Sequence, residues 1–189
     1  MTNNSSPHTW TILSSGYALD DKWFRVRKDM IQLPSGRVLD DYFVWESPDV
    51  SVIVPLTVEG KFILCEQYKH GLGRVTYLFP SGAVDQNETP EQAAHRELEE
   101  ETGYVCNEVE YLTSVSGNVA KVVGLYHLYV SRNVQPGGQM RDDDTEETRI
   151  LFKTADELRQ LIDDRKIIAA SSLVAALMVL QRLAEESLA

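Results

Sequence analysis

Residues 82–104 read GAVDQNETPEQAAHRELEEETGY, and the middle of this stretch has the features of a helix with defined ends. Thr89 is suited to the N-cap position and Pro90 to the first helical position, and a glutamine three residues after the threonine completes a capping box. Gly103 is suited to end the helix in the left-handed conformation. The sequence therefore predicts a helix from about residue 90 to residue 102.

The end of this helix is rich in glutamate, and three of the carboxylates share one side. At about 100° per residue, Glu97, Glu100 and Glu101 fall within one arc of roughly 100°, whereas Glu99 points in nearly the opposite direction. Clustered carboxylates repel one another unless a cation neutralises them, and oxygen ligands are those that Mg²⁺ prefers. A solvated acidic surface is the other interpretation of such a helix.

The spacing of the whole stretch favours the metal site. The pattern is Gly, five residues, Glu, seven residues, Arg-Glu, an aliphatic residue, any residue, Glu-Glu, any residue, Gly and an aliphatic residue. This pattern resembles the Nudix box, and every fixed position is occupied as the box requires. The one soft departure is Tyr104 in the last aliphatic position, which we expect to leave the chemistry unchanged.

The resemblance implies an enzyme that cleaves a nucleoside diphosphate linked to another moiety with the help of divalent cations, Mg²⁺ or else Mn²⁺. Glu100 and Glu101 would take part in catalysis through the bound metal. The implied metal ligands are the side chains of Glu97, Glu100 and Glu101 and the backbone carbonyl of Ser81. The residues assigned to the structure of the motif are Gly82, Glu88, Arg96 and Gly103.

The stretch before the box, EQYKHGLGRVTYLFPSG at residues 66–82, is similar to the corresponding stretch of the ADP-ribose and nucleotide-sugar pyrophosphatase branch. The likeness covers roughly residues 20–185. It implies a homodimer that the N-terminal unit helps to form, in which the partner chain lines the substrate site.

The branch also carries a functional glutamate in an acidic loop, which corresponds here to DDDTEE at residues 142–147. Glu146 is the best match, with Glu147 and Asp144 as fallbacks. The implied role is that of general base for the attacking water or of an additional metal ligand. By composition alone, the loop could equally be a solvated acidic segment.

Three departures from the branch bear on the substrate. Leu78 stands where the branch usually has a glutamate, and residues 114–121 lack the proline that marks many ADP-ribose hydrolases. Lys69 replaces the usual arginine, so a point charge stands in place of a bidentate fork. These departures leave the reaction class intact but weaken the assignment to ADP-ribose specifically.

Candidate substrate-binding residues lie on both sides of this stretch. Lys69 and Arg74 can hold a diphosphate, although basic residues flanking strands are often plain surface. Trp23 and Tyr42 can stack on a nucleobase, with packing in the core or at the dimer interface as the alternative. The histidines His70 and His127 have no carboxylate at metal-binding spacing, and we interpret both as structural.

The chain has 189 residues and a net charge of −11, which disfavours binding to nucleic-acid backbones. Two cysteines without a CxxC motif favour a reducing compartment, and no stretch has the length of a membrane span or the pattern of a secretory signal. We therefore expect a cytoplasmic protein.

Hydrophobic patterning predicts a lead-in at residues 1–9, an N-terminal β unit at 10–48 and a main domain at 49–189. Strands are expected in the N-terminal unit around a PSG turn, in a second hairpin around residues 59–60, and at 122–130, with two closing helices. The fold class is α/β (α+β): a mixed sheet between helices with a small N-terminal β unit.

The function expected is metal-dependent hydrolysis of the diphosphate in a nucleoside diphosphate sugar, with ADP-ribose favoured. Its products would be a nucleoside monophosphate and a sugar phosphate. One alternative is a Nudix hydrolase acting on NADH, coenzyme A or a dinucleoside polyphosphate. Another is a catalytically silent sensor of nucleotide sugars, although such a sensor would be expected to lose glutamates of the box.

Overall fold

The computed structural model describes residues 8–22, 24–141 and 147–188, which form two compact units. Unit 1 contains the residues up to Pro48 together with the segment Asn118–Gly124. Unit 2 contains Asp49–Gly117 and the chain from Leu125 onward.

The strands are β1 (Thr11–Asp20), β2 (Arg25–Gln32), β3 (Val38–Glu46), β4 (Val50–Thr57), β5 (Phe62–Lys69), β6 (Arg74–Leu78), β7 (Ser81–Ala83), β8 (Tyr104–Val105), β9 (Glu110–Val115), β10 (Tyr126–Pro136) and β11 (Thr148–Lys153). The helices are the short 3-10 helix η1 (His70–Leu72) and the α-helices α1 (Pro90–Thr102), α2 (Ala155–Asp163) and α3 (Ala170–Glu186).

Unit 1 is an antiparallel sheet in the order β1-β2-β3, joined by a segment from the connection between β9 and β10. The amide of Trp45 donates to the carbonyl of Lys121 at 2.7 Å, and the amide of Val123 donates to the carbonyl of Trp45 at 3.1 Å. These bonds are why the strand expected at residues 122–130 begins only at Tyr126: its first residues extend the sheet of unit 1 instead.

Unit 2 is built on a sheet in the order β11-β5-β4-β10-β8, with β6 beside β5, β7 beside β4 and β9 beside β10. The pairing of β4 with β10 is parallel and the other pairings are antiparallel, so the sheet is mixed. Strand β4 is buried along almost its whole length and β10 is buried from Leu128 to Ser131, as is typical of strands that are covered on both faces.

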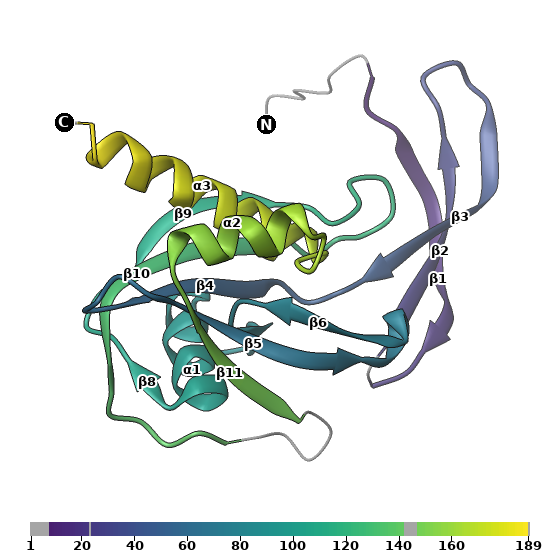
Figure 1. The fold of residues 1–189 in the computed structure, drawn as a ribbon. Helices are drawn as coiled ribbons and strands as arrows, with labels where there is room; N and C mark the ends of the chain where they lie inside the picture. Colours follow the sequence, from purple (N-terminus) through teal and green to yellow (C-terminus); the bar gives the residue numbers. More distant parts are fainter. Residues whose placement is uncertain (1–7, 23, 142–146, 189) are drawn as a thin grey trace. The chain divides into compact units, whose positions relative to one another are not determined.

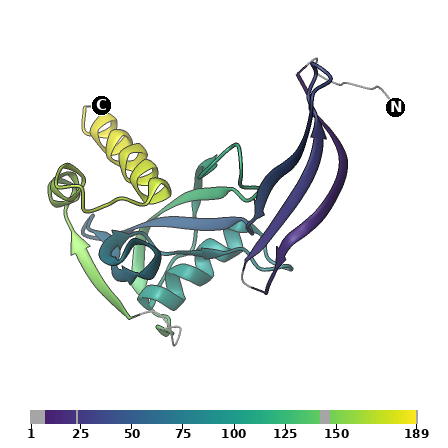
Figure 2. The same cartoon turned by 90° about the vertical axis from the view of Figure 1, so that its right-hand side faces the viewer.

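Helices cover both faces of this sheet (Figures 1 and 2). On one face, Ala94 and Leu98 of α1 pack against Ile53 and Ile63. On the other face, α2 and α3 pack on the alternate side chains of the same strands in a larger cluster, which includes Leu64. The predicted mixed sheet between helices is thereby confirmed.

Helix α1 has the bounds that its capping residues predicted. The hydroxyl of Thr89 accepts from the amide of Gln92, and the side chain of Gln92 accepts from the amide of Thr89, at 3.2 and 2.8 Å. Gly103 ends the helix with a φ of 71°, a conformation that favours glycine. No helix in the described part of the chain has both the length and the apolar character needed to cross a bilayer.

Candidate active site

The side chain of Arg96 is the centre of the box. It forms a bidentate pair with Glu88, with both N···O distances at 2.9 Å, and its Nη2 donates to the carbonyl of Ala83 at 2.9 Å. Its Nη1 lies 2.5 Å from Glu97 and 3.2 Å from Glu100. The paired guanidinium lowers the pKa of Glu88, and the carboxylates raise that of Arg96. This arrangement supports the structural role expected for Glu88 and Arg96.

The carboxylate of Glu97 is held in a space that only glycine leaves open. A Cβ on Gly82 would stand 1.9 Å from Oε1 of Glu97, so any larger residue would displace that carboxylate. Burial raises the pKa of Glu97, and the hydrogen bond from Arg96 opposes this rise. A buried carboxylate with a raised pKa is stabilised in its charged form by a nearby cation.

Glu101 leaves the helix on the side of the sheet. Its Oε2 lies 3.3 Å from the thiol of Cys65 on β5, and its Oε1 lies 3.5 Å from the amide of Ser81 on β7. The thiol is fully buried, whereas the glutamate that faces it is partly exposed. Glu101 therefore lies beside Ser81, whose carbonyl is the backbone ligand expected from the sequence.

The residues of the box fit a hard divalent cation. Their donors are carboxylate and carbonyl oxygens, the ligands that Mg²⁺ and Mn²⁺ prefer, and Gly82 leaves room for one of them. Within the described residues, no three acidic, histidine or cysteine side chains already converge as a metal site. Arg96 draws Glu97 and Glu100 together, while Glu101 turns toward Cys65.

The acidic loop ends beside the same face of the sheet. Glu146 and Asp144 lie outside the described residues, but Thr148 accepts a hydrogen bond from Gln67 at 2.8 Å. Gln67 is two residues from Cys65 on β5, so both side chains are on the α1 face. Glu147 lines a pocket of about 640 Å³ together with Glu66 and Thr148.

Lys69 and Arg74 are brought together by a tight hairpin. They form the last cross-strand pair of β5 and β6, on either side of η1. Lys69 has the same strand parity as Cys65 and Gln67, which directs it to the α1 face. Leu78, at the other end of β6, is buried.

Tyr42 is already engaged within unit 1. The Nζ of Lys121 lies 3.3 Å from its ring centroid, Trp10 meets the ring edge-on at 5.5 Å, and its hydroxyl donates to the carbonyl of Ala120 at 2.6 Å. These contacts favour the packing interpretation of Tyr42 over nucleobase stacking. Trp23 lies outside the described residues.

His127 has a carboxylate partner that sequence reasoning missed. Its Nε2 lies 3.0 Å from Asp49, and its Nδ1 lies 2.8 Å from the hydroxyl of Ser114. Asp49 also accepts from the amide of Leu125 at 2.9 Å, and this bond and the one to His127 lower its pKa. The partners are far apart in sequence, so no local pattern could reveal them.

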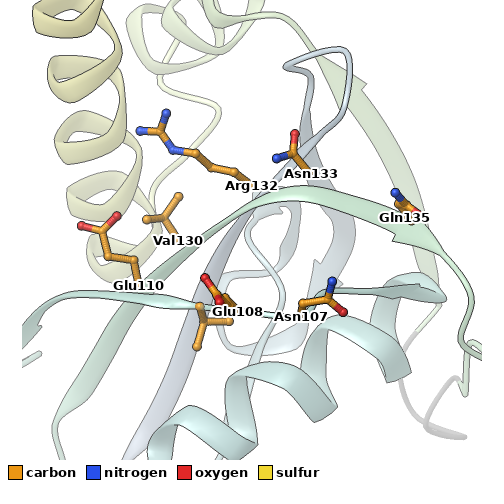
Figure 3. A pocket seen from close by; sticks show the side chains of 8 residues that line it. Asn107, Glu108, Glu110, Val130, Arg132, Asn133 and Gln135 are labelled. Atoms are coloured by element: carbon orange, nitrogen blue, oxygen red, sulfur yellow. The ribbon is translucent and has the colours of Figure 1, made fainter.

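A separate pocket lies where β10 leaves β9, and Figure 3 shows its polar lining. Its volume is about 440 Å³, and Arg132 at its edge pairs with Glu186 of α3 at 2.6 Å. The lining residues are Asn107, Glu108, Val109, Glu110, Val130, Arg132, Asn133 and Gln135. None of them belongs to the candidate site.

The structure combines a mixed sheet, a capped helix rich in glutamate, and Gly82 packed against the carboxylate of Glu97. These features can be compared with those of known protein families. Residues 47–171 match the NUDIX domain, so the chain belongs to the Nudix family. Residues 10–45 match the nucleoside diphosphate sugar hydrolase N-terminal domain.

Curated relatives and a solved structure match most of the chain. It is 29% identical over 152 residues to the methanol dehydrogenase activator of Bacillus methanolicus, covering 80% of this chain and 82% of that protein. It is 26% identical over 143 residues to the ADP-ribose pyrophosphatase of Bacillus subtilis (strain 168), covering 75% and 77%. A crystal structure of an ADP compounds hydrolase superposes with a TM-score of 0.85 over 96% of this chain and 98% of that chain, at 23% identity, and supports the fold.

Proposed function

We propose that this protein hydrolyses the diphosphate linkage of a nucleoside diphosphate sugar, with ADP-ribose favoured, to a nucleoside monophosphate and a sugar phosphate. The observation that carries the proposal is the placement of the box carboxylates around Gly82 and Arg96. The match of the N-terminal segment to a nucleoside diphosphate sugar hydrolase domain supports the substrate class.

Each residue of the site has a definite task in this reaction. Glu97, Glu100, Glu101 and the carbonyl of Ser81 would hold Mg²⁺ or Mn²⁺. When bound, the metal would neutralise the diphosphate and lower the pKa of a water molecule. Arg96 keeps the carboxylates in place, because it joins two of them to the loop through Glu88.

The catalytic base in this proposal is Glu146, which would accept a proton from the water that attacks phosphorus. The support comes from its neighbours in the chain. Thr148, two residues later, bonds to Gln67 on the sheet face that carries Cys65 and its contact to Glu101. Lys69 would neutralise charge on the substrate from the same face.

The test is a panel of ADP-ribose, other ADP- and GDP-linked sugars, NADH, coenzyme A, diadenosine polyphosphates and nucleoside triphosphates, incubated with Mg²⁺ and separated by chromatography. We expect AMP from ADP-ribose. In Glu100→Gln the rate should fall by more than about a hundredfold, because a metal ligand is lost while an amide can still bond to Arg96. A normal rate in this variant would refute the metal site.

Glu99→Gln is the matched control. It makes the same change of charge one residue earlier, but the Glu99 carboxylate faces the backbone of Gln139, whose amide lies 3.5 Å from Oε1. We expect this variant to keep the wild-type rate, which separates the loss of a ligand from a general loss of negative charge.

A second candidate substrate class is another nucleoside diphosphate derivative such as NADH, coenzyme A or a dinucleoside polyphosphate. It is favoured by Leu78, which is buried where the ADP-ribose branch usually has a glutamate, and by Lys69 in place of an arginine. Cleavage of one of these compounds in preference to ADP-ribose would select this candidate. Binding of a nucleotide sugar without cleavage of any compound would select a sensor.

The proposed assembly is a homodimer formed through unit 1. Every residue of β1 is exposed, and β1 is an edge strand of its sheet. Three large apolar side chains on this sheet, those of Ile12, Leu19 and Phe43, are exposed by 43–56%, and such surfaces are typical of interfaces. Light scattering after size exclusion should give twice the chain mass of 21.3 kDa.

The proposed location is the cytoplasm. Neither Cys65 nor Cys106 is in a disulfide: the thiol of Cys65 contacts Glu101, and that of Cys106 contacts His95. A reducing compartment preserves such thiols. Cell fractionation tests this assignment.

A further inference from the structure

Arg141 stands beside the box but was not among the residues that the sequence singled out. Its amide donates to the carbonyl of Glu100 at 2.8 Å, and its Nη1 lies 3.8 Å from Oε1 of the same residue. An exposed arginine is thus anchored through its backbone to a candidate metal ligand. Its location is therefore set by the helix.

The segment that leads to Arg141 follows the C-terminal end of α1. The amides of Gly137 and Gly138 donate to the carbonyl of Gly103 at 3.3 and 3.1 Å. Both bonds use the carbonyl of the residue that ends α1. Together with the bond from the amide of Arg141 to Glu100, they hold the main chain of this arginine close to the box.

The two arginines near Glu100 differ in how many of their side-chain hydrogen-bond donors already have partners. The guanidinium of Arg96 is occupied by Glu88, Glu97, Glu100 and the carbonyl of Ala83. The side chain of Arg141 is 67% exposed, and its ion pair of 3.8 Å is longer than a hydrogen bond. The donors of Arg141 are therefore directed to solvent at the edge of the carboxylate cluster.

A planar guanidinium suits a phosphate because it can donate two parallel hydrogen bonds. Lys69, which strand parity directs to the α1 face, can supply only a point charge, whereas Arg141 offers an exposed guanidinium beside Glu100. Building on the proposed function, we propose that Arg141 binds the diphosphate of the substrate beside the metal-binding carboxylates.

The experiment measures binding and turnover separately. The probe is the non-hydrolysable methylene-bridged analogue of ADP-ribose, titrated by calorimetry at saturating Mn²⁺ into the full-length protein. Arg141→Gln should weaken its binding about tenfold or more, because two charge-assisted hydrogen bonds are lost. Arg141→Lys should weaken it less, since charge remains but the fork does not. KM for the hydrolysed substrate should rise in the same order.

Arg149→Gln is the matched control. Arg149 is also an exposed arginine in a loose ion pair, 3.4 Å from Glu66, but strand parity directs it to the sheet face opposite the box. Its loss should leave both analogue binding and KM at the wild-type values. Thermal unfolding of all three variants should match the wild type, so a binding defect would not come from misfolding.

Two results would overturn the proposal. If Arg141 only neutralises Glu100, Arg141→Gln will bind Mn²⁺ more tightly in a spin-resonance titration while the analogue binds as in the wild type. If the charge of Arg141 only stabilises the C-terminal end of α1 through the helix dipole, Arg141→Lys will match the wild type in every measurement. A wild type that neither binds the analogue nor cleaves a nucleotide sugar would instead refute the proposed function, and this inference with it.

Discussion

Helices α1 and α3 lie on opposite faces of the same sheet, and they are stabilised in different ways. Helix α1 has a capping box at Thr89, a proline at its start and a glycine at its end, and its buried side includes Glu97. Helix α3 begins after Ala169 without a side-chain cap and ends without a glycine. Its buried residues are Ser172, Ala175, Ala176, Val179 and Leu180.

The difference shows how the fold separates stability from chemistry. The apolar face of α3 contributes to the large cluster that also contains α2, whereas α1 contributes only Ala94 and Leu98 to the smaller one. Helix α1 can therefore carry four glutamates near its end, because capping and Arg96 hold it in place. Substitutions in the two helices should accordingly change different properties.

The largest effect on stability should come from Leu180→Ala in α3. The side chain is 6% exposed, and its removal should lower the free energy of unfolding by about 2–5 kcal/mol. Urea unfolding followed by far-UV circular dichroism measures this loss, because the helices of unit 2 contribute to that signal. Leu177→Ala on the exposed side of the same helix should cost less than about 1 kcal/mol. Activity per folded molecule should remain unchanged, and a fall in it would contradict the separation.

For Gly82→Ala, next to α1, we expect activity to fall and stability to remain unchanged. The added methyl group collides with the end of the flexible Glu97 side chain, which can move at little cost to the fold. Displacing this carboxylate should lower kcat/KM by about a hundredfold. The urea midpoint should stay close to that of the wild type.

Partial recovery of kcat/KM in the double variant Gly82→Ala/Glu97→Asp would show that the collision is the cause. The shorter aspartate withdraws its carboxylate from the added methyl group. A double variant as slow as, or slower than, Gly82→Ala would show that the glycine acts in another way.

The smallest change in stability should come from adding a side-chain N-cap to α3, which lacks the one that α1 has at Thr89. Ala169 has the extended backbone of an N-cap residue, with φ of −66° and ψ of 119°, but no side-chain oxygen. Ala169→Ser should raise the free energy of unfolding by about 0.5–1 kcal/mol. Ala170→Ser, one position inside the helix, should give no gain. Equal effects of the two serines would show that capping is not the reason.

Local signals in the sequence determined much of the site. The bounds of α1 followed from Thr89, Pro90 and Gly103, because capping depends on residues within one turn of the helix end. Strand β1 was not recognised, since all its residues are exposed and its apolar residues do not alternate regularly. The N-terminal unit was expected at residues 10–48, but the segment at 118–124 also belongs to its sheet.

Sequence alone determined which residue types are present at the box and in what order, and that was sufficient to predict its helix and reaction class. Tertiary structure alone decided which distant groups meet: Cys65 contacts Glu101 of the box, Gln67 contacts Thr148, and His127 contacts Asp49. The physical reason is that helix caps and turns depend on neighbours along the chain. Contacts across a sheet depend on strand order and register, which residues throughout unit 2 set together.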